Sequence, residues 1–163
     1  MAFKVRTTGA SDYGRYIKML VAGNPGAGKT LLASTALNPI YASAEGGLMS
    51  IADKGLPYVE IEKIDDLLEL KQMLEQDETV RKSIFKRPID TVVIDTIDEV
   101  QRILIRERLK SQKHEAMQMQ DWGWLGSQMQ AIVSGFRNLP LNVIFNVHLK
   151  EISDGESGVV WFA

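Results

Sequence analysis

The sequence contains no cysteine, and this absence removes two kinds of chemistry. Disulfide bonds cannot form, and metal sites built from thiolates are excluded. The absence fits a reducing compartment, so we expect a cytoplasmic protein. No apolar run is long enough to span a bilayer, and the N-terminus lacks the apolar core of a signal peptide. We therefore expect no membrane partner.

A strong charge of either sign is also lacking. The chain carries 19 lysines and arginines against 21 aspartates and glutamates, which gives a net charge of −2. A domain that attracts nucleic acid through its overall field is strongly basic, so any nucleic-acid contact here needs a local basic patch. The 163 residues and the 45% hydrophobic content suit one globular domain with a real core.

The most informative segment that is present is residues 23–30, Gly-Asn-Pro-Gly-Ala-Gly-Lys-Thr. It is a complete phosphate-binding loop (P-loop), in which glycines let backbone N–H groups wrap a polyphosphate at the start of a helix. Lys29 can reach the β- and γ-phosphates, and the Thr30 hydroxyl can bind Mg²⁺. The predicted nucleotide-binding residues are Asn24, Pro25, Gly26, Ala27, Gly28, Lys29, Thr30 and Leu31. A degenerate loop that binds nucleotide without hydrolysing it is the alternative.

Apolar strand-like runs alternate with helix-like segments along the chain. The pattern predicts strands at 17–22, 39–44, 58–61, 91–95 and 141–147. It predicts helices at 31–37, from Asp65 or Asp66 onward, at 97–110 and at 122–138, with a basic connector at 81–87. This alternation is typical of an α/β protein whose mostly parallel central sheet has helices on both faces. We expect residues 1–15 to form an arm or an edge strand, and residues 16–163 to form the ATPase domain. An alternative is that the sheet of this domain extends beyond residue 163.

Two carboxylates are candidates for the chemistry around a bound triphosphate. Asp95 ends the β-branched run Thr91-Val-Val-Ile, where an acid can hold Mg²⁺ opposite Thr30; an N-cap of the following helix is the plain alternative. One large ATPase class places a catalytic glutamate directly after this aspartate, but Thr96 occupies that position. Glu45 ends another strand and is followed by two glycines, so we predict that it activates water, against the alternative of an exposed turn carboxylate.

Four blocks in order resemble the RecA-type recombination ATPase core: GNPGAGKT at 23–30, YASAEGG at 41–47, TVVIDT at 91–96 and MQAIVSGFRNLPLNVIFNVHLKE at 129–151. Residues 121–125 and 146–148 are also similar to blocks of short phage-encoded Sak-type single-strand-annealing proteins, which are often labelled as AAA nucleotide-binding proteins. The resemblance implies a three-layer P-loop NTPase (RecA-like) fold, ATP and Mg²⁺ as cofactors, and a homo-oligomeric ring or filament. In this class, hydrolysis usually occurs between protomers, with an arginine finger that the sequence does not identify.

The resemblance also implies a role for the end of the last long strand. In the family, a polar residue there senses the γ-phosphate, and Asn146 and His148 occupy this place. The family usually has glutamine where this chain has His148, and a surface histidine is the alternative reading. We therefore carry Glu45, Lys29 and His148 as the candidate catalytic residues, with Thr30 and Asp95 as the candidate metal ligands.

The sequence gives weaker support for DNA binding. After His148 the chain reads Lys150, then Glu151, Asp154 and Glu156, which is net acidic. Two basic clusters lie elsewhere, and a solvated surface is the simplest interpretation of both. The first comprises Arg102, Arg106, Lys110 and Lys113, and the second comprises Arg81, Lys82, Lys86 and Arg87. Three tryptophans could stack on bases, but we expect core or subunit contacts for Trp122 and Trp124 and a strand position for Trp161.

Two functions fit the sequence. The first is a Mg²⁺-dependent, RecA-like ATPase that binds ATP and ADP and acts in single-strand DNA annealing or recombination, with single-stranded DNA as a partner. The second keeps the nucleotide site but uses it as a switch or assembly module that acts on protein partners without DNA.

Overall fold

The computed structural model describes residues 16–149, 151–153 and 160–162. The expected arm at 1–15 and the acidic residues Asp154 and Glu156, with Lys150, lie outside the described residues. The elements follow in the order β1 (Lys18–Gly23), α1 (Lys29–Ala33), β2 (Pro39–Ser43), η1 (Leu48–Lys54), β3 (Tyr58–Glu60), α2 (Ile64–Leu74), α3 (Glu78–Phe85), β4 (Thr91–Asp95), α4 (Ile97–Gln112), α5 (Met119–Arg137), β5 (Asn142–His148), β6 (Glu151–Ser153) and β7 (Val160–Phe162).

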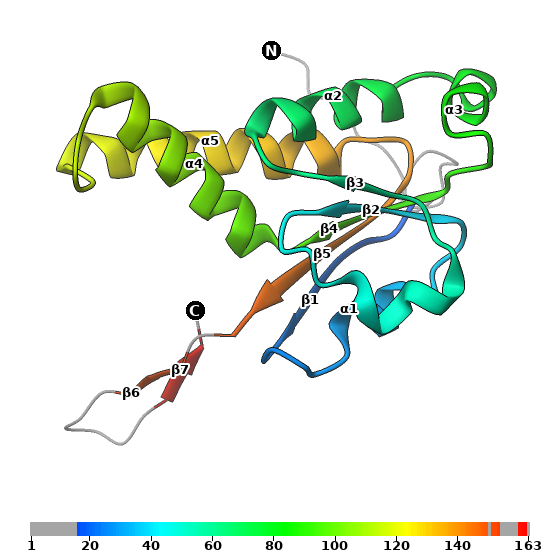
Figure 1. Ribbon diagram of the computed structural model, residues 1–163, viewed down its shortest axis with the longest axis horizontal. Helices are drawn as coiled ribbons and strands as arrows, with labels where there is room; N and C mark the ends of the chain where they lie inside the picture. Colours follow the sequence, from blue (N-terminus) through cyan, green and yellow to red (C-terminus); the bar gives the residue numbers. More distant parts are fainter. Residues whose placement is uncertain (1–15, 150, 154–159, 163) are drawn as a thin grey trace, which may run out of the picture.

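Strands β1 to β5 form one parallel sheet in the order β1-β5-β4-β2-β3. Helices α2 to α5 lie over one face of this sheet, and α1 and the 3₁₀ helix η1 lie over the other (Figure 1). The predicted three-layer α/β P-loop NTPase architecture is confirmed. Strands β6 and β7 pair with each other in antiparallel fashion and form a separate small sheet.

The core lies in two clusters that the alternation of side chains along the strands creates. Val92 and Ile94 of β4 face the larger cluster, under α2, α4 and α5. Val93 of the same strand faces the smaller one, under α1 and η1, together with Tyr41 of β2 and Ile144 of β5. Every residue of β2 and β4 is buried, which explains why these strands read as continuous apolar runs.

The register of the sheet gathers the ends of four strands at one edge. Gly23 at the end of β1 lies beside His148 at the end of β5, and Ser43 at the end of β2 lies beside Asp95 at the end of β4. In open parallel sheets, ligands bind outside the carboxyl ends of the strands. The fold therefore places the predicted phosphate-binding, metal-binding and catalytic residues near this one edge.

Several predicted boundaries need correction. The segment 81–87 is not a connector, because α3 covers Glu78–Phe85 and Arg81 is buried within it. Asp66 does not N-cap α2: the N-cap is Lys63, and the Asp66 carboxylate accepts the Lys63 backbone N–H at 2.9 Å from the third helical position. Helix α1 ends at Ala33, and η1 was not predicted. Among the described residues, no helix is long and apolar enough to cross a membrane.

Candidate active site

The P-loop connects β1 to α1 and borders a cavity of about 430 Å³. Gly26 and Gly28 have φ values of 77° and 87°, a backbone conformation that other residues rarely adopt, so these two positions need glycine. Asn24 and Ala27 shape the loop, because the Ala27 N–H donates to the Asn24 carbonyl at 3.1 Å. The cavity is lined by Pro25, Gly26, Gly28, Lys29, Thr30, Leu31, Glu45, Gly47, Ser50, Asp95, Thr96 and His148.

Lys29 connects the P-loop to two other predicted residues. Its Nζ donates to the carbonyl oxygens of Gly23 and Asn24 at 2.9 and 3.1 Å, and contacts Nδ1 of His148 at 3.1 Å. His148 Nε2 in turn contacts Oε2 of Glu45 at 3.1 Å. An ammonium group can only donate, so Nδ1 accepts and the imidazole proton sits on Nε2, which donates to Glu45. Lys29, His148 and Glu45 thus form a continuous polar chain across the cavity.

Asp95 faces the P-loop from the end of β4 and is 6% exposed. The Thr30 hydroxyl donates to its Oδ2 at 2.7 Å, and Asn146 Nδ2 donates to its Oδ1 at 3.1 Å. Both carboxylate oxygens are therefore held, and the carboxylate has a fixed orientation beside the hydroxyl of the P-loop threonine.

The oxygen groups at this place fit Mg²⁺. The ion prefers hard oxygen ligands, keeps several waters, and is bound in phosphate sites through one or two protein groups plus the phosphates. Thr30 and Asp95 supply such a pair, and the buried Thr96 hydroxyl beside them has no hydrogen-bond partner within the protein. Among the described residues there is no cluster of three or more histidine, cysteine or acidic side chains that could hold a metal alone. The site is thus suited to an ion that arrives with a nucleotide.

The sequence matches the profile of the AAA domain family over residues 15–160, which is most of the chain. The chain belongs to the AAA domain family. It is therefore a P-loop NTPase, and the family indicates a nucleotide-binding ATPase. No curated protein matches the sequence closely enough to name a relative.

Two further residues of this AAA domain hold the site, and sequence reasoning missed their contacts. Asn146 was placed near the phosphate sensor, but its side chain is fully buried against Asp95. Asp98 lies in the first turn of α4, and its carboxylate accepts the backbone N–H of His148 at 2.7 Å. The position of Asn146 as the one polar residue of the apolar run Val143-Ile-Phe-Asn-Val147 was the sequence signal that it has a partner. The contact of Asp98 joins two elements that are distant in the sequence, so no local sequence pattern indicates it.

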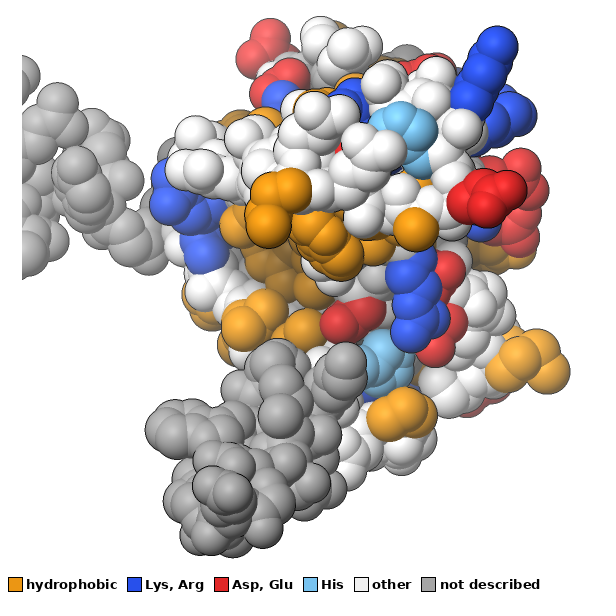
Figure 2. Space-filling view, turned by 90° about the vertical axis from the view of Figure 1, so that its left-hand side faces the viewer, with side chains coloured by type: hydrophobic (Ala, Val, Ile, Leu, Met, Phe, Trp, Pro, Cys, Tyr) orange, Lys and Arg blue, Asp and Glu red, His pale blue; other side chains and the backbone are white. Residues whose placement is uncertain are grey.

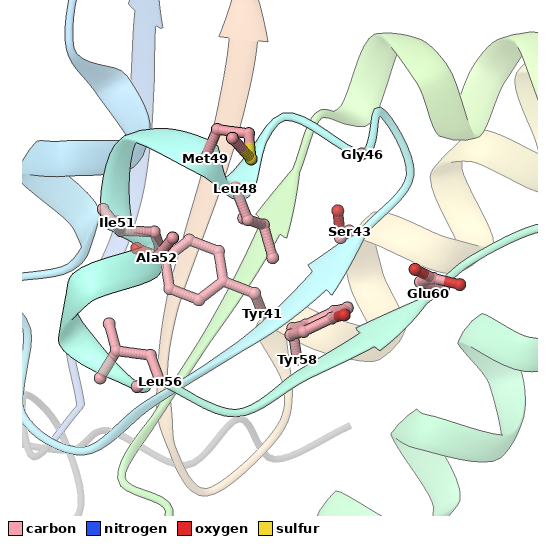
Figure 3. A pocket seen from close by; sticks show the side chains of 11 residues that line it. Tyr41, Ser43, Gly46, Leu48, Met49, Ile51, Ala52, Leu56, Tyr58 and Glu60 are labelled. Carbon is pink, nitrogen blue, oxygen red and sulfur yellow. The ribbon is translucent and has the colours of Figure 1, made fainter.

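A second cavity of about 370 Å³ lies between η1 and strands β2 and β3 of the AAA domain. Its apolar wall includes the rings of Tyr41 and Tyr58 with Leu48 and Leu56, and Glu60 lies at one end (Figure 3). The Tyr41 hydroxyl donates to the Thr30 carbonyl at 2.9 Å. Burial, and to a lesser degree the Asp95 carboxylate, raise the pKa of Tyr41, so this donor keeps its proton. Tyr41 thereby links β2 to the first turn of α1.

Three arginines of the basic clusters have partners within the protein, whereas Lys82, Lys86, Lys110 and Lys113 are exposed. Arg81 is 8% exposed and donates to the backbone of Gln76 at 2.6 Å. Arg102 pairs with Glu99 at 2.8 Å, and Arg106 donates to the Glu62 carbonyl at 2.9 Å. On the face seen in Figure 2, lysine and arginine side chains lie among acidic ones. The AAA domain therefore shows no continuous cationic track in the described part of this surface.

The Asp121-Trp-Gly-Trp-Leu125 segment has a structural role at the start of α5. Asp121 is fully buried; it accepts the Gln118 backbone N–H at 2.9 Å and pairs with Arg108 at 2.8 Å and with His114 at 3.3 Å. The Arg108 guanidinium lies 4.9 Å from the ring centre of Trp124. The Trp124 interpretation as a packing residue fits this contact, whereas Trp122 is 54% exposed. Trp161 lies in β7.

Proposed function

We propose that this AAA domain is a Mg²⁺-dependent ATPase of the RecA-like type that acts in single-strand DNA annealing or recombination, in a phage-encoded context. The observation that carries the proposal is the chain Lys29–His148–Glu45, which lines the same cavity as the Thr30–Asp95 pair. A P-loop that only binds nucleotide does not need a carboxylate linked to the phosphate-binding lysine.

The residues divide the chemistry among them. Backbone N–H groups of residues 24–30 and the Lys29 ammonium bind the phosphates of ATP. Thr30 and Asp95 would hold Mg²⁺, which supplies neutralisation of phosphate charge when it is bound. Glu45 takes a proton from a water molecule whose oxygen attacks the γ-phosphorus, and ADP leaves with the electron pair of the broken P–O bond. His148 lies between Lys29 and Glu45, where it responds to the presence of the γ-phosphate.

The chain is an ATPase in this proposal only as part of a homo-oligomeric ring or filament, in which a neighbouring protomer supplies an arginine to the site. The RecA-type resemblance supports this, because the class hydrolyses ATP between protomers. A DNA partner rests on the same resemblance alone.

The alternative is a nucleotide-gated switch or assembly module for protein partners. The contacts of Arg81, Arg102 and Arg106 favour it, because each of these side chains already has a partner within the protein. It shares the nucleotide site with the first proposal and differs in what the bound nucleotide controls.

One experiment separates the two proposals. ATP turnover is measured with and without single-stranded DNA, for the wild type and for Glu45→Gln. The ATPase proposal expects a DNA-stimulated rate that falls by about 100-fold or more in the variant, because a positioned general base contributes roughly 10²–10⁴-fold. Nucleotide binding with no turnover and no response to DNA would overturn it and support the switch.

A further inference from the structure

We infer that Asn146 is a positioning residue for the magnesium-binding carboxylate, an inference that rests on the proposed Mg²⁺-dependent nucleotide site. Asn146 lies on β5, the neighbour of β4 in the sheet, and its side chain is fully buried. Its Nδ2 donates to Asp95 Oδ1 at 3.1 Å, while the Thr30 hydroxyl donates to Oδ2 of the same carboxylate at 2.7 Å.

The two donors approach different oxygens of Asp95, so together they fix the plane of the carboxylate. With Thr30 alone, the carboxylate could still rotate about the bond to its carbon chain. The amide of Asn146 removes this freedom, and it leaves the lone pairs that point into the cavity available for a cation or its bound water. The nitrogen of the amide must be the atom that faces Asp95, because the amide oxygen and the carboxylate would repel.

A purely structural role does not explain an asparagine at this position. The neighbouring positions along β5 are apolar, with Val143 and Phe145 in the larger core cluster and Ile144 in the smaller one. A buried amide costs free energy unless it is fully hydrogen-bonded, and the Oδ1 of Asn146 has no partner within the protein. A leucine or valine would stabilise this strand at lower cost. The contact with Asp95 is the gain that the amide provides.

The same strand offers a matched control. Asn142 lies four positions earlier on the same face of β5, and its Nδ2 contacts the Thr91 hydroxyl at the start of β4 at 3.4 Å. Asn142→Leu therefore makes the same substitution, in the same strand, against the same neighbouring strand. It differs from Asn146→Leu in lying at the far end of β4 from Asp95, and in removing the acceptor of the Ile17 backbone N–H, which donates to Asn142 Oδ1 at 2.9 Å.

The test measures the affinity for a fluorescent ATP analogue with and without Mg²⁺, together with thermal unfolding of the nucleotide-free protein. In Asn146→Leu, the factor by which Mg²⁺ strengthens nucleotide binding should fall about 10- to 100-fold, as is common when a residue that orients a metal ligand is lost. The Mg²⁺-free affinity should stay at the wild-type value. Asn142→Leu should keep the wild-type Mg²⁺ factor even if its melting temperature falls.

A second variant keeps the inference testable if Asn146→Leu does not fold. Asn146→Ala removes the same amide donor and adds no bulk at this buried position. The Mg²⁺ factor should therefore fall as it does in Asn146→Leu. An unchanged factor in either folded variant overturns the role of Asn146 alone, because the wild type still binds Mg²⁺ and nucleotide. A wild type whose nucleotide binding ignores Mg²⁺ overturns the proposed function as well.

Discussion

Replacing His148 with alanine should strengthen ADP binding. The Lys29 ammonium donates to the Gly23 and Asn24 carbonyls and to His148 Nδ1, at 2.9, 3.1 and 3.1 Å. An ammonium has three N–H donors, so all of them are in use. To reach the β-phosphate, Lys29 must give up at least one partner, and His148 is the one that faces the cavity. The histidine therefore competes with the nucleotide for the lysine.

The expected size of the effect follows from the net value of one hydrogen bond. Such a bond contributes about 1 kcal/mol, which corresponds to a roughly fivefold change in a binding constant. His148→Ala should thus bind ADP about fivefold more tightly than the wild type. ATP binding should change less, because the variant also loses the contact that His148 is proposed to make with the γ-phosphate. ATP turnover should fall, because Glu45 loses its partner.

Calorimetric titration of ADP and of a non-hydrolysable ATP analogue checks this reasoning. His148→Gln is the control, since the glutamine amide offers one acceptor for Lys29 and one donor for Glu45 and should behave nearly as the wild type. Weaker or unchanged ADP binding in His148→Ala would refute the competition. Tighter ADP binding in His148→Gln as well would show that the imidazole, rather than its hydrogen bonds, is responsible.

Three other predictions concern the site and its support. Lys29→Ala should abolish measurable nucleotide binding in the same titration, with little loss of secondary structure by circular dichroism. Tyr41→Phe should lower the free energy of unfolding in urea by about 1 kcal/mol, because the Thr30 carbonyl loses the Tyr41 hydroxyl and keeps only the Ser34 backbone N–H as a donor. The Gln118 backbone N–H, followed by Arg108 and His114, lowers the pKa of Asp121. The Asp121 carboxylate therefore stabilises the fold above its ordinary pKa of 3.8, and this stabilisation is lost as the pH falls through the pKa of the folded protein. Asp121→Asn should accordingly reduce the dependence of the free energy of unfolding on pH in the acidic range.

Much of the fold could be predicted because its signals are local. The glycine pattern of the P-loop, the β-branched run that ends in Asp95 and the apolar run around Val143 each identify an element without reference to any other. The alternation of such elements then restricts the architecture to a parallel sheet with covered faces. The predicted boundaries were wrong where a charged side chain is buried rather than solvated. Arg81 was predicted to lie in an exposed connector, but its guanidinium donates to backbone carbonyls at the end of α2.

The candidate site was less predictable where it depends on strand order. Gly23 lies beside His148 and Ser43 lies beside Asp95 only because β5 and β4 are inserted between β1 and β2. No local pattern encodes that insertion, so the contact of Asp98 with the His148 backbone could not be expected. Lys29 and Glu45 were predicted from their local sequence and His148 from the family resemblance, and their roles in hydrolysis remain predictions.

The position of β1 at the border of the five-stranded sheet has a consequence for how ligand binding can be observed. Among the described residues, β1 pairs only with β5, and Met19 and Leu20 within it are exposed, as is Ile17 just before it. The strand that carries the P-loop thus lies at a border of the sheet with one neighbouring strand, and its backbone amides should exchange with deuterated solvent sooner than those of β4. A nucleotide held by the loop restrains this strand directly. Slower exchange at β1, more than at any central strand, should therefore report occupancy of the cavity.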